Sequence, residues 1–224
     1  MIDEARPQEQ GRQQFRELCY RCRRPKDLCL CPTEPPMRTR TRIVLLMHPM
    51  EWRREKCTTG RLTCLNLENS EIIPGLRFEE NSRYRELVDD PANYPVLLYP
   101  GPSAWDLSTG NFPAADIGTR RLVVFLIDST WACSKVLLRE NPELLRLPRI
   151  KFTPTQPSRY IIKRQPSPDY LSTIEATHEL LLALERSGLD QYPDKERLLA
   201  TFFAMRDYQI ERLKTDYRPR RKNK

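Results

Sequence analysis

Short apolar runs alternate with helix-like patterns along most of this chain, and this alternation predicts the fold class. The apolar runs lie at residues 42–48, 71–73, 95–100, 121–128 and 149–153, the last being the weakest. The helical patterns lie between and after them, at residues 58–69, 130–140, 172–188 and 194–214. Continuous apolar strands that alternate with helices are typical of a mostly parallel sheet with helices on both faces. The sequence therefore predicts an α/β protein.

Local signals set several of the predicted boundaries. Pro49 ends the first strand, and Asn141-Pro142 ends the predicted helix at residues 130–140. Ser172 and Glu175 form a capping-box pattern, and Gly188 closes the helix that they open. The last helix has apolar residues spaced as one buried face: Leu199, Phe202, Phe203, Ile210 and Leu213.

Four regions follow along the chain. Residues 1–18 form a polar leader, and residues 19–36 form a compact element rich in cysteine and proline. Residues 37–215 form the α/β domain, and residues 216–224 form a basic tail. We expect the leader and the tail to contribute little to the core, because they are almost wholly polar.

Composition narrows the class of protein. Hydrophobic residues make up 39% of the 224 residues and charged residues 30%, with a net charge of +8. No run approaches the roughly 18 apolar residues of a membrane helix, and the polar N-terminus does not resemble a signal peptide. We therefore expect a soluble cytoplasmic protein without a membrane partner, and we see no sign of an obligate protein partner.

The positive charge is concentrated in two segments. Arg218 to Lys224 contain five cations and no acid, and Leu144 to Pro168 contain six cations and no acid. Phe152 and Tyr160 lie among the six. Cations attract phosphate backbones and aromatic rings stack on unpaired bases, so the pattern favours RNA binding. A solvated surface with a flexible tail is the alternative interpretation.

The cysteines supply the first specific feature. Four of the seven follow the spacing Cys19-x2-Cys22-x6-Cys29-x-Cys31. Four thiolates complete a tetrahedral shell around zinc, which would stabilise a small loop that has no core of its own. Such a site would be structural. Reduced thiols and an iron–sulfur cluster remain the alternatives.

The second specific feature is Asp128-Ser129-Thr130-Trp131, where a predicted strand meets a helix. Ligands bind at the carboxyl ends of strands in open α/β sheets, and a carboxylate there is suited to act as a general base. An acidic or hydroxyl residue before a helix is also often only an N-cap.

Further motifs lie at other element boundaries. They are His48-Pro-Met-Glu51, Thr58-Thr59-Gly60-Arg61, Tyr99-Pro100 and the run from Leu171 to Ala176. Gly60 would let the backbone approach a ligand, and Arg61 is suited to hold a carboxylate or a phosphate. The chain has no Walker or G-x-G-x-x-G pattern, which disfavours nucleoside triphosphate and dinucleotide chemistry.

Taken in order, these motifs resemble those of the DTW-domain family, the tRNA-uridine aminocarboxypropyltransferases. Asp128-Ser129-Thr130-Trp131 is similar to the D-x-T-W signature, and the four cysteines resemble the family's N-terminal element. The boundary motifs are also similar, except that Thr58 stands where asparagine is expected. The resemblance covers most of residues 19–190, and the compact form resembles the bacterial type.

The resemblance implies a SPOUT-like fold with a knotted C-terminal cofactor region. It also implies transfer of the 3-amino-3-carboxypropyl group of S-adenosylmethionine to N3 of a tRNA uridine, with release of 5′-methylthioadenosine. The variable-loop uridine is the expected target, and the D-loop is the second choice. An S-adenosylmethionine-dependent RNA methyltransferase and a non-catalytic, zinc-containing RNA-binding module remain the alternatives.

Roles for individual residues follow from the resemblance. Asp128 is expected to accept the uridine proton, with Trp131 packed beside it. The expected cofactor-binding residues are His48, Thr59, Gly60, Arg61, Tyr99, Pro100, Ser129, Thr130, Leu171, Ser172, Thr173, Glu175 and Ala176. The expected RNA-binding residues are Arg61, Arg159, Lys163, Arg164, Arg218, Arg220, Arg221 and Lys222. Cys19, Cys22, Cys29 and Cys31 are the expected zinc ligands.

Overall fold

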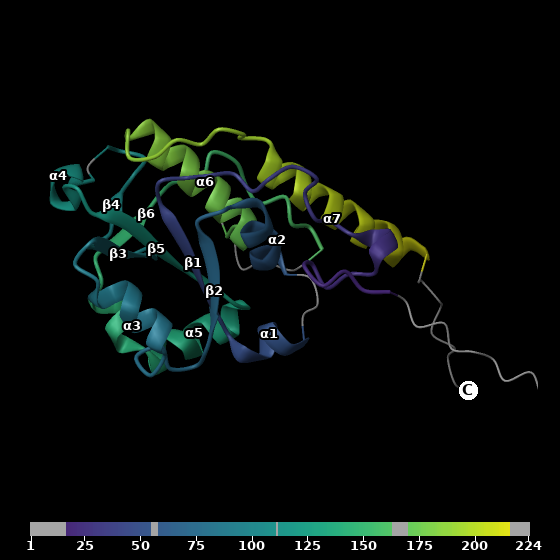
Figure 1. Cartoon of the computed structure of the whole chain (residues 1–224), viewed down its shortest axis with the longest axis horizontal. Helices are drawn as coiled ribbons and strands as arrows, with labels where there is room; N and C mark the ends of the chain where they lie inside the picture. The colour runs from purple at the N-terminus through teal and green to yellow at the C-terminus, as the bar shows by residue number, and fades with distance from the viewer. Residues whose placement is uncertain (1–16, 55–57, 111, 163–169, 216–224) are drawn as a thin grey trace, which may run out of the picture.

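A six-stranded parallel sheet forms the centre of the molecule (Figure 1). The computed structural model describes residues 17–54, 58–110, 112–162 and 170–215. The strands are β1 (Arg42–Met47), β2 (Ser70–Pro74), β3 (Asn93–Leu98), β4 (Trp105–Asp106), β5 (Arg121–Asp128) and β6 (Arg149–Lys151). Their order is β2-β1-β5-β3-β6-β4, and every paired neighbour is parallel. The α/β prediction is confirmed.

Helices cover both faces of this sheet. They are α1 (Pro49–Arg54), α2 (Thr59–Asn66), α3 (Ser82–Asp89), α4 (Ala114–Ile117), α5 (Trp131–Glu140), α6 (Thr173–Arg186) and α7 (Arg197–Thr215). Two short 3-10 helices occupy Lys26–Leu28 and Pro142–Arg146. Figure 1 shows α2, α6 and α7 on one face and α1, α3 and α5 on the other.

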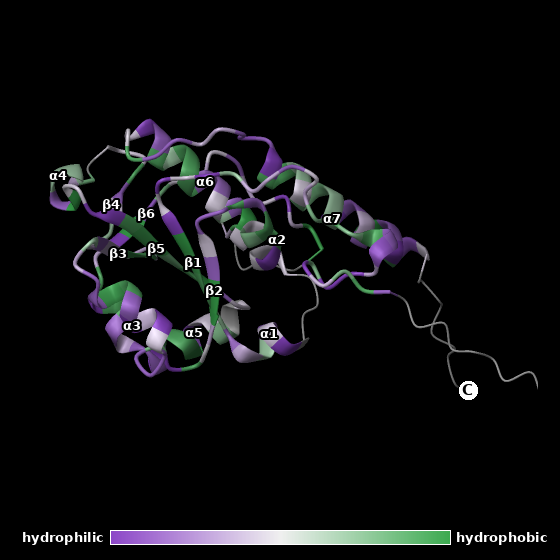
Figure 2. Ribbon diagram, viewed as in Figure 1, coloured by the Kyte–Doolittle hydropathy of each residue, from purple (hydrophilic) through white to green (hydrophobic). Residues whose placement is uncertain are grey.

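The strand period of two divides the core into two layers. Ile43 and Leu45 of β1 join the cluster under α2, α6 and α7, whereas Val44 and Leu46 face the cluster under α3 and α5. All four side chains are fully buried. Figure 2 shows green, hydrophobic residues along β1 and β5 and on the helices that cover them. Burial on both faces explains why the strands are continuous apolar runs rather than alternating ones.

Three α-helices of the described chain, α1, α3 and α4, were not expected from the sequence, and one predicted helix face was partly wrong. Pro49 ends β1 as predicted but also begins α1, because proline is favoured at a first helical position. Helix α3 buries only Tyr84 and Leu87, which is too sparse a pattern to predict.

Helix α7 buries Leu198, Phe202 and Met205. Of the expected face, Phe202 is therefore buried and Phe203 packs partly against the core, whereas the rest of that face is not buried. Its Leu213 is 62% exposed. The last turns of α7 extend beyond the sheet, where no core remains to cover them (Figure 1).

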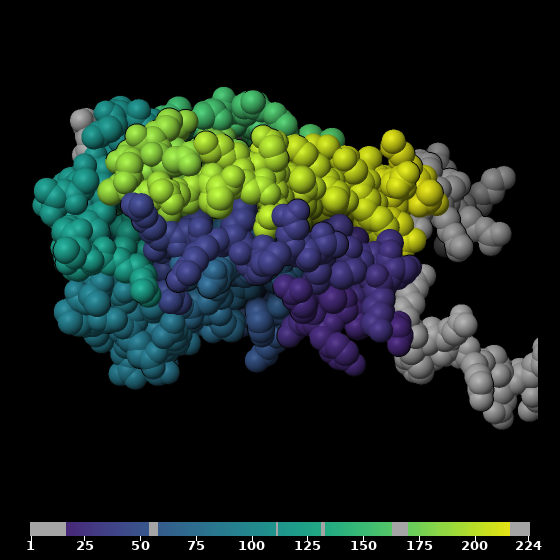
Figure 3. All heavy atoms as spheres, turned by 45° about the horizontal axis from the view of Figure 1, so that its top comes forward, coloured from purple at the N-terminus to yellow at the C-terminus, as the bar shows by residue number. Residues whose placement is uncertain are grey.

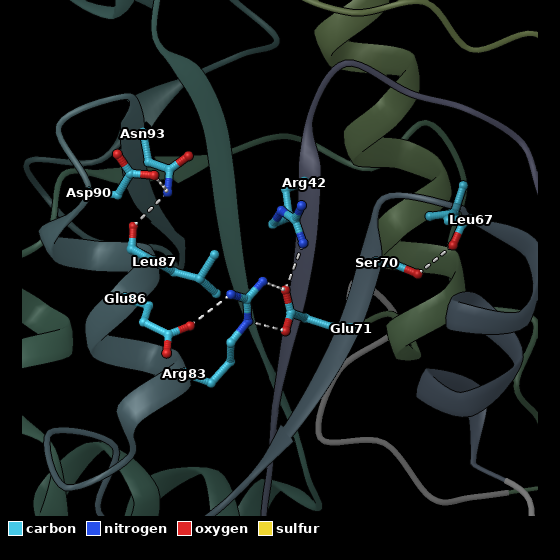
Figure 4. Close-up of polar contacts among 9 residues, drawn as sticks. All are labelled: Arg42, Leu67, Ser70, Glu71, Arg83, Glu86, Leu87, Asp90 and Asn93. Carbon is cyan, nitrogen blue, oxygen red and sulfur yellow. Dashed lines mark hydrogen bonds and ion pairs between the residues drawn. The ribbon is translucent and has the colours of Figure 1, made fainter.

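Charged side chains fasten α3 to the edge of the sheet (Figure 4). The Glu71 carboxylate on β2 accepts hydrogen bonds from Arg42 on β1 at 2.8 Å and from Arg83 on α3 at 2.8 and 2.9 Å. Burial alone would raise the pKa of Glu71, but the two arginines hold it below its usual value. The network stays charged at neutral pH and positions α3 against β1 and β2.

A buried carboxylate fixes the position of α6 relative to β1. Asp190, in the connection between α6 and α7, accepts hydrogen bonds from the backbone amides of Arg40 at 2.7 Å and Thr41 at 2.9 Å. Asp190 is only 3% exposed, so these bonds satisfy a charge that burial would otherwise make costly. They tie the C-terminal end of α6 to the start of β1. The opposite end of α6 lies beside the candidate site described below.

Candidate active site at the carboxyl ends of the strands

The motifs predicted from the sequence gather at one edge of the sheet. Strand β5 ends at Asp128, which is in register with Met47 at the end of β1. His48 directly follows Met47, and Tyr99 follows the end of β3, the other neighbour of β5. Because all the strands are parallel, their carboxyl ends meet on the same side.

Asp128 is the point where three of these segments meet. The hydroxyl of Thr173, the first residue of α6, donates a hydrogen bond of 2.7 Å to Asp128 Oδ1. Gly60, in the first turn of α2, lies so close that a Cβ atom there would be 2.0 Å from Asp128 Oδ2. The Asp128 side chain is only 7% exposed. The structure therefore holds one partly enclosed carboxylate between the starts of α2 and α6.

Asp128 does not cap the helix that follows it. The N-cap of α5 is Thr130, whose hydroxyl accepts from the backbone amide of Cys133 at 3.4 Å. Ser129 lies within hydrogen-bonding distance of Ser134, with 2.9 Å between their hydroxyl oxygens. The capping role that the sequence left open thus belongs to Thr130. The side chain of Trp131, the first residue of α5, lies outside the described part of the chain.

The surroundings of Asp128 keep a neighbouring thiol neutral. Burial, together with the negative charge of Asp128, raises the pKa of Cys64 on α2 to about 12. A thiol with such a pKa is a weak nucleophile at neutral pH. Cys64 is therefore a packing residue of the site wall.

Arg61 lies next to Gly60 and stacks on a tryptophan that the sequence analysis did not identify. Its Cζ atom lies 3.9 Å from the centroid of the Trp52 ring, and its Nη2 donates to the Trp52 carbonyl at 3.0 Å. Thr58 caps α2 by accepting from the Arg61 amide at 3.2 Å. The available signal was that Trp52 follows His48 by four residues, about one helical turn, and its amide donates to the His48 carbonyl at 3.1 Å.

His48 itself closes a local turn. Its Nδ1 accepts a hydrogen bond from the Met50 amide at 3.2 Å.

On the other side of β5, Gly101 follows Tyr99-Pro100 and leaves room for the Arg149 guanidinium. A Cβ atom at position 101 would lie only 2.5 Å from Arg149 Nη1. Arg149 also donates to the Ser103 hydroxyl at 2.6 Å. Arg149 is thus a cation at this edge that sequence reasoning placed only within a basic run.

The predicted capping box at the start of α6 is confirmed, and it does more than cap the helix. The Glu175 carboxylate accepts from the Ser172 amide and hydroxyl at 2.9 and 2.6 Å. It also accepts from the Ser158 hydroxyl at 2.9 Å and the Arg159 amide at 2.7 Å. Glu175 therefore holds the loop after β6 against α6. A direct contact of Leu171, Glu175 or Ala176 with a cofactor stays a prediction.

The four predicted metal ligands form one compact cluster. Cys19 and Cys31 have Sγ atoms 3.6 Å apart, Cys22 and Cys29 have Sγ atoms 3.7 Å apart, and all four Sγ atoms lie within 4.8 Å of one another. A tetrahedral shell with Zn–S bonds of about 2.3 Å places its sulfurs roughly 3.8 Å apart, so the cluster fits zinc. Backbone amides of Cys22 and Arg21 lower the pKa of Cys19 to about 6, whereas burial and contacts with the other thiols raise the pKa values of Cys31 and Cys29.

Comparison with known protein families decides the relationship. The model of the DTW domain matches residues 16–210, which include the cysteine cluster, Asp128 and the start of α6. The chain belongs to the DTW-domain family. The relationship predicted from the motifs is therefore confirmed.

Curated relatives of this DTW-domain chain carry one activity in their names. The chain is 34% identical to tRNA-uridine aminocarboxypropyltransferase 2 of Drosophila melanogaster, over 76% of this chain and 67% of the fly protein. It is 30% identical to the protein of that name from Mus musculus, over 88% and 64% of the two chains. It is 26% identical to tRNA-uridine aminocarboxypropyltransferase A of Arabidopsis thaliana, over 80% and 77%. No solved structure matches the chain.

The DTW-domain chain thus spans about two thirds of the length of its fly and mouse relatives. These relatives are eukaryotic, and the bacterial type inferred from the motifs stays a prediction. Within the described part of the chain, no helix combines the length and the apolar character needed to cross a membrane.

The basic segment after β6 differs from its prediction in one respect. Phe152 and Tyr160, expected to be available for base stacking, pack against the core cluster under α7, and Tyr160 lies 5.6 Å from Phe202 between ring centroids. Arg159 is exposed and lies over Phe203 on α7 at 5.3 Å. Arg61, also a predicted RNA contact, is only 7% exposed and stacks on Trp52. The remaining predicted RNA contacts lie outside the described residues: Lys163, Arg164, Arg218, Arg220, Arg221 and Lys222.

Proposed function

We propose that this chain transfers the 3-amino-3-carboxypropyl group of S-adenosylmethionine to N3 of a tRNA uridine, with release of 5′-methylthioadenosine. Membership of the DTW-domain family and the shared name of its relatives support the reaction class. The variable-loop uridine is the proposed target. The cytoplasm, where tRNA is abundant and thiols stay reduced, is the proposed location.

The observation that carries this proposal is the convergence of three motifs on Asp128. Gly60 and Thr173 come from helices on either side of it in sequence, and both lie against its carboxylate. A hydrogen bond to Oδ1 fixes the orientation of the carboxylate, and close backbone approach at Gly60 leaves it little room to rotate. A general base needs this kind of positioning more than it needs a perturbed pKa.

The proposed chemistry is a displacement at carbon. N3 of uridine forms a bond to the methylene carbon attached to the sulfonium, and the bond from that carbon to sulfur breaks. The electron pair stays on sulfur, which leaves as the neutral thioether of methylthioadenosine. Asp128 accepts the N3 proton, because neutral uridine is a poor nucleophile. Orientation of the methionine arm toward N3 distinguishes this reaction from methyl transfer.

Other residues at the same edge are proposed to hold the cofactor. Arg61 would bind its carboxylate, since a stacked guanidinium offers directed donors. The other residues proposed to line the cofactor site are His48, Thr59, Gly60, Tyr99, Pro100, Ser129, Thr130, Leu171, Ser172, Thr173, Glu175 and Ala176. Trp131 would pack beside Asp128. The knotted cofactor region of SPOUT proteins belongs to the same proposal, and an experimental structure with bound cofactor would test it.

The cysteine cluster is proposed to hold structural zinc, because its four sulfurs fit a tetrahedral shell without an open position. The metal would fasten residues 19–31, which have almost no regular secondary structure of their own. No step of the reaction needs it.

Product analysis tests the proposed function directly. Purified protein would be incubated with unmodified tRNA and S-adenosylmethionine, and nucleosides and small molecules would be identified by mass spectrometry. We expect aminocarboxypropyluridine and methylthioadenosine in equal amounts. A methylated nucleoside with S-adenosylhomocysteine would replace the proposed reaction by methyl transfer. Unmodified tRNA without cofactor binding would favour a non-catalytic RNA-binding module.

Asp128→Asn tests the proposed base. Asparagine retains an oxygen for the Thr173 hydroxyl but does not accept the uridine proton, so we expect turnover to fall about 10²- to 10⁴-fold. Cofactor affinity, measured by calorimetry, should change only a few-fold. Asp106→Asn, a change of a partly buried carboxylate at the end of β4, is the matched control and should retain turnover. Near-normal turnover of Asp128→Asn would remove Asp128 from the role.

A further inference from the structure

An exposed aromatic ring stands at the tip of the cysteine element, which we define as residues 19–36. Tyr20 lies between the first two cysteines and is 96% exposed. The tip is closed by two backbone hydrogen bonds of 2.7 Å, from the Cys19 amide to the Arg24 carbonyl and from the Arg23 amide to the Cys19 carbonyl. Arg23 adopts a positive φ of 60° to complete this turn. The backbone is thus held in one conformation while the ring projects into solvent.

Tyr20 contrasts with the other aromatic side chains considered for RNA binding. Phe152 and Tyr160 pack against the core, whereas Tyr20 offers both faces of its ring. Because the turn already fixes the backbone around this ring, little backbone entropy remains to be lost when a ligand binds. Arg21 beside it is also exposed. An aromatic ring next to a cation matches the chemistry of an unpaired nucleotide, which presents a base for stacking and a phosphate for charge pairing.

Side-chain stacking connects this tip to the candidate active site. The Arg23 guanidinium lies over the Trp52 ring at 5.0 Å, and the Arg61 guanidinium lies over the same ring at 3.9 Å. Arg61 directly follows Gly60, which contacts Asp128. Arg23 in the tip and Arg61 beside Gly60 are therefore linked through the Trp52 ring. On this arrangement we expect an RNA whose uridine reaches Asp128 to lie near the tip as well.

The other side of the cysteine element is anchored to α7. Arg24, which is 6% exposed, lies over the Tyr208 ring at 4.7 Å. Arg197 donates to the Pro35 carbonyl at 2.7 Å and pairs with Glu34. Figure 3 shows the purple cysteine element lying against the yellow α7. With one side fixed on α7 and another on Trp52, the direction in which Tyr20 projects is set by the fold.

We propose that the tip of the cysteine element is an RNA-binding site, in which Tyr20 stacks on an unpaired base and Arg21 pairs with an adjacent phosphate. The RNA would be the one whose uridine reaches Asp128, so the identity of this RNA as tRNA rests on the proposed function. The role given to the cysteine element is then to present Tyr20, in addition to stabilising the N-terminal region.

Three variants test the site. Equilibrium dissociation constants for unmodified tRNA would be measured by filter binding, without cofactor, at several salt concentrations. Tyr20→Ala should weaken binding about tenfold, near the lower end of the range for one lost base stack. Tyr20→Phe keeps the stacking face and should stay within about twofold of the unchanged protein. Arg21→Ala should weaken binding and lower the salt slope by about one, whereas Tyr20→Ala should leave that slope unchanged.

The controls separate this inference from the proposed function. Metal content and thermal midpoint of the Tyr20 variants should equal those of the unchanged protein, because the ring makes no packing contact. Equal tRNA affinity of Tyr20→Ala and the unchanged protein would overturn the inference even if the product analysis succeeded. No tRNA binding by the unchanged protein would also overturn it. Loss of affinity in Tyr20→Ala with no uridine product would support the RNA site and contradict the proposed reaction.

Discussion

At the scale of single residues, Gly60 and Asp128 depend on each other's size. The space that a side chain at position 60 would occupy already contains the Asp128 carboxylate, with Oδ2 at 2.0 Å and Cγ at 2.8 Å from an added Cβ. Asp128 has no simple way to yield, because Thr173 holds its other oxygen. The glycine of the T-T-G-R motif is therefore required by a tertiary contact and not by a turn.

Gly60→Ala should reduce turnover at least about tenfold, since the added methyl group displaces Asp128. The free energy of unfolding should fall by about 1–3 kcal/mol, as for other overpacked sites. Both quantities would be measured together with Asp128→Ala and the double variant. Asp128→Ala removes the clashing atoms, so adding Gly60→Ala to it should cost much less stability than in the unchanged protein. Additive losses would contradict the steric explanation.

A second residue-scale effect concerns His178 on α6. Its Nδ1 lies 3.1 Å from the Tyr192 hydroxyl oxygen, and its side chain is buried. Burial lowers the pKa of His178, while the nearby Glu179 and Glu196 oppose this shift. The folded pKa is below the unfolded one, so the unfolded state binds more protons as pH falls. This contribution to stability is present above about pH 6.5 and is lost below it.

We therefore expect the unchanged protein to lose stability to urea between pH 7.5 and pH 5.5, and His178→Gln to lose less. Glutamine can still bond to Tyr192 but does not titrate. The chain has only one other histidine, His48, for which His48→Gln is the matched control that should retain the full pH dependence. The same pH dependence in His178→Gln would assign it to carboxylates instead.

At the scale of elements, the start of α6 organises the loop that follows β6. Glu175 accepts four hydrogen bonds, from Ser172 and from residues 158 and 159. One turn later, Glu179 accepts from the Thr155 amide and hydroxyl at 3.2 and 2.6 Å. Two carboxylates of one helix thus replace regular secondary structure in this loop. The same turn presents Thr173 to Asp128. The first turn of α6 therefore holds both the loop after β6 and the carboxylate of Asp128 in place.

Glu175→Gln should lower the free energy of unfolding by about 1.5–3 kcal/mol, the usual range for hydrogen bonds to a charged group. The amide retains one acceptor oxygen but turns an NH2 group toward donors that the carboxylate satisfied. Urea unfolding would measure the change, and Glu211→Gln on the exposed side of α7 is the control with no expected effect. A cost equal to that of the control would mean that the loop is held by other contacts.

At the scale of the whole molecule, the cysteine element joins parts that the sheet does not connect. It touches Trp52 after β1 through Arg23, and it touches α7 through Arg24 and Glu34. Arg23 and Arg24 lie in the loop between Cys22 and Cys29, and Glu34 follows Cys31. Loss of metal from the cysteine cluster would therefore affect both the N-terminal region and the surroundings of Arg61.

We expect equimolar zinc in protein purified without chelators, measured by elemental mass spectrometry. Removal of the metal should lower the thermal midpoint by about 5–10 °C, because metal binding contributes to folding free energy. Emission of Trp52, isolated by replacing Trp105 and Trp131 with phenylalanine, should shift to longer wavelength. Cys22→Ser should abolish metal binding, whereas Cys133→Ser on α5 should retain it. Metal-free protein with four titratable thiols in the cluster would contradict the zinc proposal.

The sequence by itself determined the parallel α/β class, five of the six described strands, the edge of the sheet where the motifs gather and the capping box. Strands buried on both faces must be apolar throughout, so β1, β3 and β5 are visible as continuous runs. Parallel strands end on one side, so motifs at several strand ends imply one site before any coordinates are known. Ser172 and Glu175 act within one helical turn, and such local interactions are encoded by spacing alone.

Tertiary structure decided what depends on residues distant in sequence. It placed Arg61 on Trp52 and turned Tyr160 into the core while leaving Tyr20 exposed. The face of α7 and the existence of α3 were also settled there. Each of these outcomes depends on which surfaces remain uncovered once the sheet and its helices have packed. A linear pattern records the apolar content of a segment, but its neighbours in space determine which side chains are buried.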